Sequence, residues 1–405
     1  MRDNGALENN HPPDRPSFVE HELTALGNPD ESAATQALTA HIAAEIARAG
    51  GWLPFDRFMH LALYAPGWGY YARDARQFGT LARDGSDFVT APELSPLFGQ
   101  ALAQQVMQAL QTSGCDTVWE FGAGSGALAE QVLTELQRLG QPVRRYTIVD
   151  VSGALRGRQQ ARLARFGRCV QWASALPQSL RGVLIGNEVL DAMPVKLLAR
   201  SGGVWHERGV TLLAGSALTQ PGDNKPPHWR WQDRPTALRP PIDVPGDHDY
   251  LTEIHPQAQA FIATLAERLE AGAMFWLDYG FGEREYYHPQ RDMGTLMCHR
   301  AHRADADALA DVGQKDMTAH VDFTGIALAG QNADLTVLGY TSQARFLLNC
   351  GIARRMERAD LSTRANAMKL LAEHEMGELF KVIGLAAGPG FDALGFSAGD
   401  RSHAL

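Results

Sequence analysis

Residues 117–126 have the sequence TVWEFGAGSG, and this stretch decides the fold. Its first five residues are apolar or β-branched apart from Glu120, which predicts a short buried strand. Glycines at positions 122, 124 and 126 then permit a tight turn, and residues 127–140 (ALAEQVLTELQRLG) have the apolar spacing of a helix. The stretch therefore predicts a strand that turns sharply into a helix and lets a ligand approach its backbone.

Strands and helices continue to alternate along the chain that follows. Further strands are predicted at 144–152, 169–174, 181–195 and 273–282, and helices at 153–166 and 257–272. This alternation predicts an α/β fold, a Rossmann-like open sheet of parallel strands with helices on both faces. Residues 334–340 and 379–388 are interpreted as the last two strands.

Composition divides the chain into a tail, a lid, a main domain and a second tail. The first residues are polar, acidic and contain proline, and we expect order to begin near Gln36, with a later long helix at 92–110. We expect a disordered tail at 1–36, an N-terminal helical lid at 37–115, the Rossmann-like domain at 116–387 with insertions at about 200–248 and 283–333, and a C-terminal tail at 388–405.

The overall composition excludes several classes of protein. Hydrophobic residues make up 45% of the 405 residues and the net charge is −9, so global disorder and a generally basic surface for DNA are excluded. The four cysteines lie far apart without a CxxC pair, which argues against a disulfide framework and a cysteine-based zinc site. No apolar run reaches the ~18 residues of a membrane helix, and the N-terminus lacks a signal sequence. We therefore expect a cytoplasmic protein, most simply a bacterial one, without membrane insertion.

The glycine turn and the acidic residues beside it predict a nucleotide-like cofactor. Gly122, Gly124 and Gly126 fit the dinucleotide fingerprint only in part, because the third glycine comes one residue early. Asp150 ends the next strand, where a carboxylate can accept hydrogen bonds from ribose hydroxyls. Glu120 would repel a pyrophosphate but suits a cationic head, which favours S-adenosyl-L-methionine over NAD. An NAD-linked oxidoreductase remains the alternative.

A wider set of motifs resembles one family. The strings LYAPGWGYYAR, DFVTAPELSPLFGQALA, EFGAGSGALA, GNEVLDAMPV, LDYGF and DMTAHVDFT, in this order, resemble the MidA-like class I S-adenosylmethionine-dependent methyltransferases. The resemblance implies a seven-stranded sheet. It also implies a protein substrate, possibly a respiratory-complex subunit, because mitochondrial members are arginine methyltransferases that assist complex I assembly. Two departures are Asp150, where the family usually has Glu, and NEVLDAMPV in place of NEFFDALPV.

Polar residues follow the predicted fourth and fifth strands. Asn187, Glu188 and Asp191 follow the fourth strand, and Asp278 and Tyr279 end the fifth. Ligands of open α/β sheets bind beyond the carboxyl ends of the strands, so these residues are expected to face the transferred methyl group. Two carboxylates three residues apart share a face if a helical turn starts there, and they would then clamp a guanidinium. The alternative is that both cap the following helix.

Other candidates lie in the second insertion and the N-terminal half. His320 and Asp322 alternate, so on an extended segment they share a side, as a substrate-side acid/base pair or a structural pair. Tyr70 and Tyr71 form either an aromatic wall of an acceptor channel or part of the buried lid. The histidines form no HExxH array, and no metal site is expected.

Two further pairs are candidates for cofactor contacts. Thr90 and Pro92 start a predicted helix, as caps or, by the resemblance, as a border of the cofactor. Trp172 and Ala173 end the third strand, where adenine usually lies in this fold, although Trp172 is equally expected in the core.

Four functions remain open at this point. The leading hypothesis is a protein methyltransferase acting on arginine, since an acidic chain attracts a basic peptide and the inserted arms could hold it by strand addition. The others are a methyltransferase for a small molecule or RNA, an assembly factor that binds the cofactor with little catalysis, and the NAD-linked enzyme. A homodimer is possible.

Overall fold

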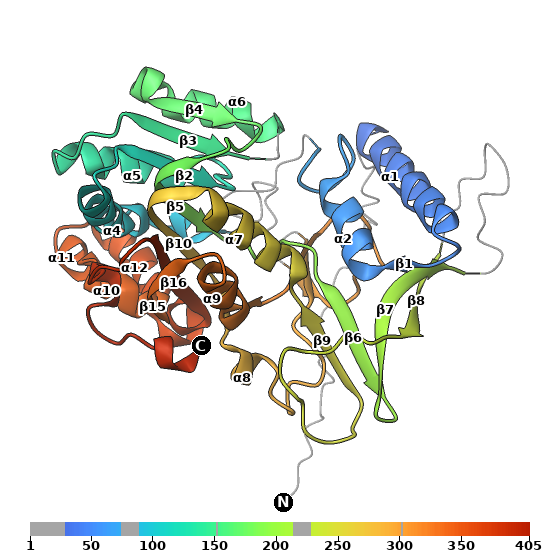
Figure 1. Cartoon of the computed structure of the whole chain (residues 1–405). Coiled ribbons are helices and arrows are strands. Elements are labelled where there is room, and N and C mark those ends of the chain that lie inside the picture. The colour runs from blue at the N-terminus through green and yellow to red at the C-terminus, as the bar shows by residue number, and fades with distance from the viewer. Residues whose placement is uncertain (1–28, 74–88, 151–152, 214–227, 301–302) are drawn as a thin grey trace, which may run out of the picture.

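The main sheet of the computed structural model confirms the predicted α/β architecture (Figure 1). The structure describes residues 29–73, 89–150, 153–213, 228–300 and 303–405. Seven strands follow one another in the order β4-β3-β2-β5-β10-β16-β15, and the short β14 pairs with β10. Their bounds are Thr117–Phe121 (β2), Arg145–Val149 (β3), Val170–Ala173 (β4), Leu180–Asn187 (β5), Leu269–Phe281 (β10), Val321–Asp322 (β14), Leu335–Ser342 (β15) and Phe380–Ala387 (β16).

The strands β4, β3, β2, β5 and β10 are mutually parallel, as the alternation predicts. The predicted last two strands are present as β15 and β16, but β16 runs antiparallel to both of its neighbours, β10 and β15. The sequence did not give the direction of these last two strands, because periodicity indicates a strand without its direction.

Two hydrophobic cores cover the two faces of this sheet. On β10, Phe275 belongs to the core under α4 and α5, whereas its neighbour Trp276 belongs to the core under α7 and α9. Successive side chains of a strand point to opposite faces, so both cores contact the same strand. The helices around this sheet are α4 (Leu97–Ser113), α5 (Ala127–Arg138), α6 (Gly153–Leu163), α7 (Pro256–Arg268), α9 (Phe323–Gln331), α10 (Gln343–Asn349), α11 (Ile352–Met356) and α12 (Leu361–Leu371).

A second unit with its own core lies beside the carboxyl ends of the parallel strands (Figure 1). It combines N-terminal helices with the antiparallel sheet β1-β7-β6-β9, in which β8 also pairs with β7, and with the small sheet β12-β11-β13. Its elements are α1 (Pro29–Arg48), β1 (Leu53–Pro54), α2 (Phe55–Tyr64), β6 (Lys196–Ser201), β7 (Val204–Leu212), β8 (Trp229–Pro235), β9 (Tyr250–Ile254), α8 (Glu283–Tyr286), β11 (Met297–Arg300), β12 (Arg303–Asp305) and β13 (Asp316–Thr318).

Several expected boundaries differ from the structure. Helix α1 begins at Pro29, seven residues before the expected start of order at Gln36, and residues 1–28 lie outside the described part. The helix predicted at 92–110 is broken into α3 (Ala91–Leu94) and α4, because Ser95 is extended and is followed by Pro96. Helix α4 packs in the core of the main sheet and is therefore not part of a separate lid.

The C-terminal residues belong to the main fold. Phe396 is buried and its ring packs against Phe346, and a carboxylate oxygen of Asp400 accepts a hydrogen bond from the backbone N–H of Tyr340 at 2.9 Å. Among the described helices, none is long and apolar enough to cross a bilayer.

Replacing Phe275 with alanine tests the central position of β10. Its ring is fully buried, so truncation should lower the free energy of unfolding by about 3–5 kcal/mol. Leu328→Ala, at a side chain that is 47% exposed on α9, is the matched control and should change it by less than about 0.5 kcal/mol. Chemical denaturation followed by circular dichroism measures both. Equal effects of the two substitutions would contradict the assigned core.

Candidate functional site

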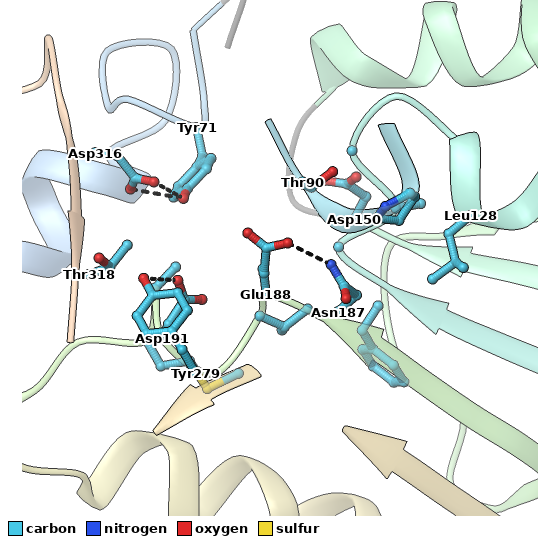
Figure 2. Close-up of a pocket in the computed structure, with 18 of the residues that line it drawn as sticks. Tyr71, Thr90, Leu128, Asp150, Asn187, Glu188, Asp191, Tyr279, Asp316 and Thr318 are labelled. Atoms are coloured by element: carbon cyan, nitrogen blue, oxygen red, sulfur yellow. Dashed lines mark hydrogen bonds between the residues drawn. The ribbon is translucent and has the colours of Figure 1, made fainter. Parts of the chain in front are cut away.

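A cavity of about 900 Å³ lies where the parallel strands end and the second unit begins (Figure 2). The carboxyl ends of β2, β3, β5 and β10 form one side, because parallel strands bring these ends to a common edge. The N-terminal region and the strand β13 form the other side. Segments that are far apart in the sequence therefore meet in one site.

The glycine turn borders this cavity through its first two glycines. Gly122 and Gly124 line it with φ of 63° and 52°, in the left-handed region that favours glycine. A Cβ on Gly122 would lie 2.9 Å from the Val189 side chain, closer than a normal contact. Gly126, with φ of 81°, precedes α5 and is not a lining residue. The predicted turn is present, and its third glycine shapes the backbone without reaching the cavity.

Two carboxyl groups flank the turn. Glu120 is almost fully buried and accepts a hydrogen bond from the Tyr146 hydroxyl at 2.6 Å, and burial raises its pKa to about 8. Asp150 accepts a hydrogen bond at 2.9 Å from the amide of Gln159, which donates at the same distance to the carbonyl of Gly124. Both carboxyl groups line the cavity, so the pair expected to bind a cofactor is brought together there.

Trp172 and Ala173 do not line this cavity, so the direct adenine contact predicted for them is not supported. The Trp172 indole N–H donates to the Gln159 side-chain oxygen at 2.8 Å, and Gln159 in turn binds Asp150. Trp172 thus orients a neighbour of the site. Both residues border a separate hollow at the end of β4, but the Trp172 side chain packs on the opposite face, against the core that contains Val170.

The loop after β5 is held by one carboxylate, that of Asp278. Its Oδ2 accepts hydrogen bonds from the backbone N–H groups of Val189, Leu190 and Asp191 at 3.1, 2.9 and 3.2 Å. Glu188, just before them, has φ of 56°, a left-handed conformation that few residues other than glycine adopt. No helix follows residue 188 directly in this described segment, so the expected shared helical face and the alternative helix caps are both wrong.

Glu188 and Asp191 nevertheless both face the cavity. Glu188 Oε1 accepts hydrogen bonds from the Asn187 amide at 2.9 Å and from the Ala91 N–H at 3.4 Å, and burial raises its pKa to about 8. Asp191 accepts a hydrogen bond from the Tyr279 hydroxyl at 2.6 Å, and burial raises the pKa of Asp191 to about 6. Asp191 Oδ1 and Asn187 Oδ1 are buried without a hydrogen-bond partner among the described residues. Two residues that line the cavity therefore each have a buried oxygen without a hydrogen-bond donor among the described residues.

A third carboxylate on this side was not singled out from the sequence. Asp316 on β13 is buried, and the Tyr71 hydroxyl donates to both of its oxygens at 2.8 Å. The Tyr71 ring stacks on Tyr64, with centroids 5.6 Å apart, and both rings line the cavity. Tyr70 is buried beneath these rings. Of the two tyrosines considered for an aromatic wall, only Tyr71 therefore lines the cavity. The available signal was the position of Asp316 at the start of DMTAHVDFT, one of the strings that carry the family resemblance.

His320 and Asp322 are separated by the structure. His320 lines the cavity with its ring 5.0 Å from that of Tyr279, and burial lowers its pKa to about 4, so it is neutral at pH 7. Asp322 instead caps α9, because it accepts a hydrogen bond from the Gly325 N–H at 3.2 Å, and it does not line the cavity. The predicted acid/base pair is therefore not formed.

The segment before α4 borders the cavity next to the glycine turn. Thr90 and Pro92 line the cavity, and Thr90 makes no side-chain cap of α3, so the capping alternative is wrong. Glu93 accepts a hydrogen bond from Ser125 of the glycine turn and lies 3.3 Å from Arg162 of α6. These contacts tie α3 to the turn.

The charges around the cavity are strongly one-sided. Six carboxyl groups are among the described lining residues, which include no Lys or Arg: Glu93, Glu120, Asp150, Glu188, Asp191 and Asp316. Burial makes each uncompensated carboxylate costly, so the arrangement favours ligands that carry positive charge and N–H donors.

Comparisons with known proteins agree with this geometry. Residues 101–341 match the family described as "Putative S-adenosyl-L-methionine-dependent methyltransferase". A crystal structure from Burkholderia thailandensis bound to S-adenosyl-homocysteine is 48% identical, with a TM-score of 0.87 over 94% of this chain and 99% of that one. Protein arginine methyltransferase NDUFAF7 from Homo sapiens is 25% identical over 76% of this chain and 72% of its own length. Its homolog from Caenorhabditis elegans is 26% identical over 77% and 76%.

S-adenosyl-L-methionine is therefore the cofactor, and the cavity suits it. The glycine turn leaves room for close approach, and the carboxyl groups on either side of it match a ribose and a cationic head.

Replacing Asp150 with alanine should weaken binding of S-adenosyl-homocysteine at least about 10-fold, because hydrogen bonds to the ribose are lost. Isothermal titration calorimetry measures this. Asp249→Ala, at an exposed position in the loop before β9, is the control and should leave the affinity unchanged. An unchanged affinity in a folded Asp150→Ala protein would contradict the assignment.

Proposed function

Because this chain belongs to the S-adenosyl-L-methionine-dependent methyltransferases matched above, we propose that its acceptor is an arginine side chain of a protein. The observation that carries the proposal is the row of Glu188, Asp191 and Asp316 in a cavity whose described lining includes no Lys or Arg. The names of the more distant relatives, protein arginine methyltransferases, support the same acceptor.

We assign the cofactor to the side of the cavity formed by the glycine turn. Gly122 and Gly124 would let it approach the backbone, Asp150 would accept the ribose hydroxyls, and Glu120 would face its amine. Thr90 and Pro92 would border it from the opposite side. When bound, the cofactor supplies a methyl group that is activated by a positively charged sulfur.

We assign the acceptor to the side that carries the tyrosine-held carboxylates. Figure 2 shows Glu188 between Asn187 and Asp150 on one side and Asp191 with Asp316 on the other. A guanidinium presents five N–H donors in a planar fork, which suits several carboxylates and the unpartnered oxygens of Asp191 and Asn187.

Glu188 is the group that we place next to the reacting nitrogen. In the displacement, a nitrogen–carbon bond forms as the sulfur–carbon bond breaks, and the nitrogen must lose a proton. The carboxylate of Glu188 can orient that nitrogen and accept the proton, because its surroundings already raise its pKa to about 8. Asp191 and Asp316 would hold the rest of the guanidinium, with Tyr279 and Tyr71 fixing their orientations.

The other functions make different demands on the cavity. An RNA acceptor would bring phosphates toward six carboxyl groups, which disfavours it. An assembly factor without catalysis has no need for unpartnered buried acceptors such as Asp191 Oδ1.

Replacing Glu188 with glutamine should lower methyl transfer by roughly 10²-fold and leave S-adenosyl-homocysteine affinity nearly unchanged, because the isosteric amide cannot take the proton. Glu267→Gln, exposed on α7, is the matched control. The assay follows radiolabelled methyl groups into proteins of a deletion-strain lysate, with acid hydrolysis to identify methylarginine. Label that appears in lysine or in RNA would overturn the arginine assignment, and an unchanged rate would remove Glu188 from the mechanism.

The raised pKa of Glu188 also predicts a pH dependence of stability. Its folded pKa of about 8 exceeds the ordinary value of 4.5, so the folded protein binds more protons between these pH values and loses stability as pH rises. Glu188→Gln lacks this titrating group, so the difference between its melting temperature and that of the wild type should shift in favour of the variant from pH 5 to pH 8. Differential scanning fluorimetry without ligand measures the difference, and a difference that does not change with pH would contradict the environment assigned to Glu188.

A further inference from the structure

The small sheet that carries Asp316 has one face in the cavity and the other in a hydrophobic core. Four side chains of the sheet β12-β11-β13 line the cavity: Met297, His299, Asp316 and Thr318. Cys298 and Met317 alternate with them along β11 and β13, and both are fully buried in the core of the second unit. The position of β13 in this sheet therefore decides where the Asp316 carboxylate lies.

A buried lysine directly precedes β13. Only 2% of Lys315 is exposed, and it does not line the cavity. Its Nζ donates a hydrogen bond to Asp305 Oδ1 at 2.8 Å and another to the backbone carbonyl of Asp307 at 2.5 Å. The Asp305 side chain is 49% exposed, so this ion pair joins a buried ammonium to a carboxylate at the surface.

The Lys315 ammonium links the two outer strands of the small sheet. Asp305 is the last residue of β12, and Lys315 is the last residue before β13. These two strands do not pair with each other, because β11 lies between them. The oxygen of Asp305 that binds Lys315 also accepts a hydrogen bond from the Asp307 N–H at 2.9 Å. One carboxylate oxygen thus fixes both the turn after β12 and the residue that leads into β13.

The stability of this loop alone does not account for a buried charge. An ammonium loses its hydration on burial, and an ion pair with a half-exposed carboxylate offsets only part of that cost. Ala308 and Val312 of the same loop already pack in the core, where apolar burial holds the loop without any charge. Hydrogen bonds are directional, whereas apolar packing is not, so the contacts of Lys315 fix a position.

We propose that Lys315 is a positioning residue for the acceptor site, whose ammonium holds the start of β13 so that the Asp316 carboxylate faces the cavity. Asp316 follows Lys315 directly and meets the Tyr71 hydroxyl across the cavity wall (Figure 2). Strand β13 has three residues and pairs with β11 alone among the described strands, so its start depends on the loop before it. This role rests on the proposed function, because Lys315 acts on the acceptor through Asp316.

Substitutions at both ends of the contact test this role. Lys315→Met keeps an aliphatic side chain without the charge, and Asp305→Ala removes the partner at a half-exposed position that tolerates truncation. With either change, the apparent KM for acceptor proteins should rise roughly 10-fold and kcat should change by less than about 2-fold, as expected for one lost hydrogen bond to a charged group. The double variant should match the single ones, because all three lose the same contact.

The KM is measured by radiolabelled methyl transfer to graded amounts of deletion-strain lysate protein. Lys369→Met, at an exposed position on α12, is the matched control and should leave the KM unchanged. S-adenosyl-homocysteine affinity should be unchanged in every variant, which separates positioning of the acceptor from a general loss of structure. If Lys315→Met does not fold, Asp305→Ala still decides the question.

Hydrogen exchange followed by mass spectrometry tests the same link without any acceptor. Amides 316–319 should exchange faster in Lys315→Met and Asp305→Ala than in the wild type or in Lys369→Met. A wild-type enzyme that labels no arginine would overturn the proposed function, and this role with it. An enzyme that labels arginine while both variants keep the wild-type KM, or lose kcat and cofactor affinity together, would overturn the role of Lys315 alone. Unchanged exchange of these amides would do the same.

Discussion

The shape of the cavity depends on the carboxylate of Asp278, which accepts hydrogen bonds from the backbone of the loop after β5. Three successive N–H groups donate to one of its oxygens, and the loop is thereby fixed without becoming a helix. Glu188 adopts its uncommon left-handed backbone at the start of this loop, a conformation that persists only when the surroundings enforce it. Asp278 is itself buried on the central strand β10, so the loop is attached directly to the sheet.

The charge of the cavity differs from that of the neighbouring face of the same sheet. The cavity at the carboxyl ends of the strands collects six carboxyl groups, and burial raises the pKa of Glu120, Glu188 and Asp191. At pH 7 and without a ligand, Glu120 and Glu188 therefore favour their protonated forms, and a positively charged ligand would favour the ionised ones. The hollow on the face of β2, β3 and β4 has arginines instead. Two of these arginines are paired with carboxylates, Arg144 with Asp116 and Arg181 with Glu270, so the one-sided charge is a feature of the cavity.

The two parts of the fold contribute unequally to the cavity. The main sheet provides the glycine turn, Asp150 and the loop that carries Glu188, which together form one side of the cavity. The second unit supplies Asp316 with Tyr71, which complete the opposite side. The carboxylate on this side comes from an insertion of the Rossmann-like fold, so an insertion helps to form the cavity.

The sequence by itself determined the alternation of strands and helices and the turn at Gly122, because these features follow from local periodicity and backbone freedom. It also located Asp150 and the group at Asn187, since the carboxyl ends of parallel strands meet at one edge. Only the tertiary structure decided that Asp316 faces Glu188's loop, because the two come from different sheets. The tertiary structure also decided that Trp172 bonds Gln159 and does not line the cavity, because local spacing does not give the direction of a side chain at a strand end. It decided that Asp322 caps α9, because local spacing does not give the residue at which that helix begins.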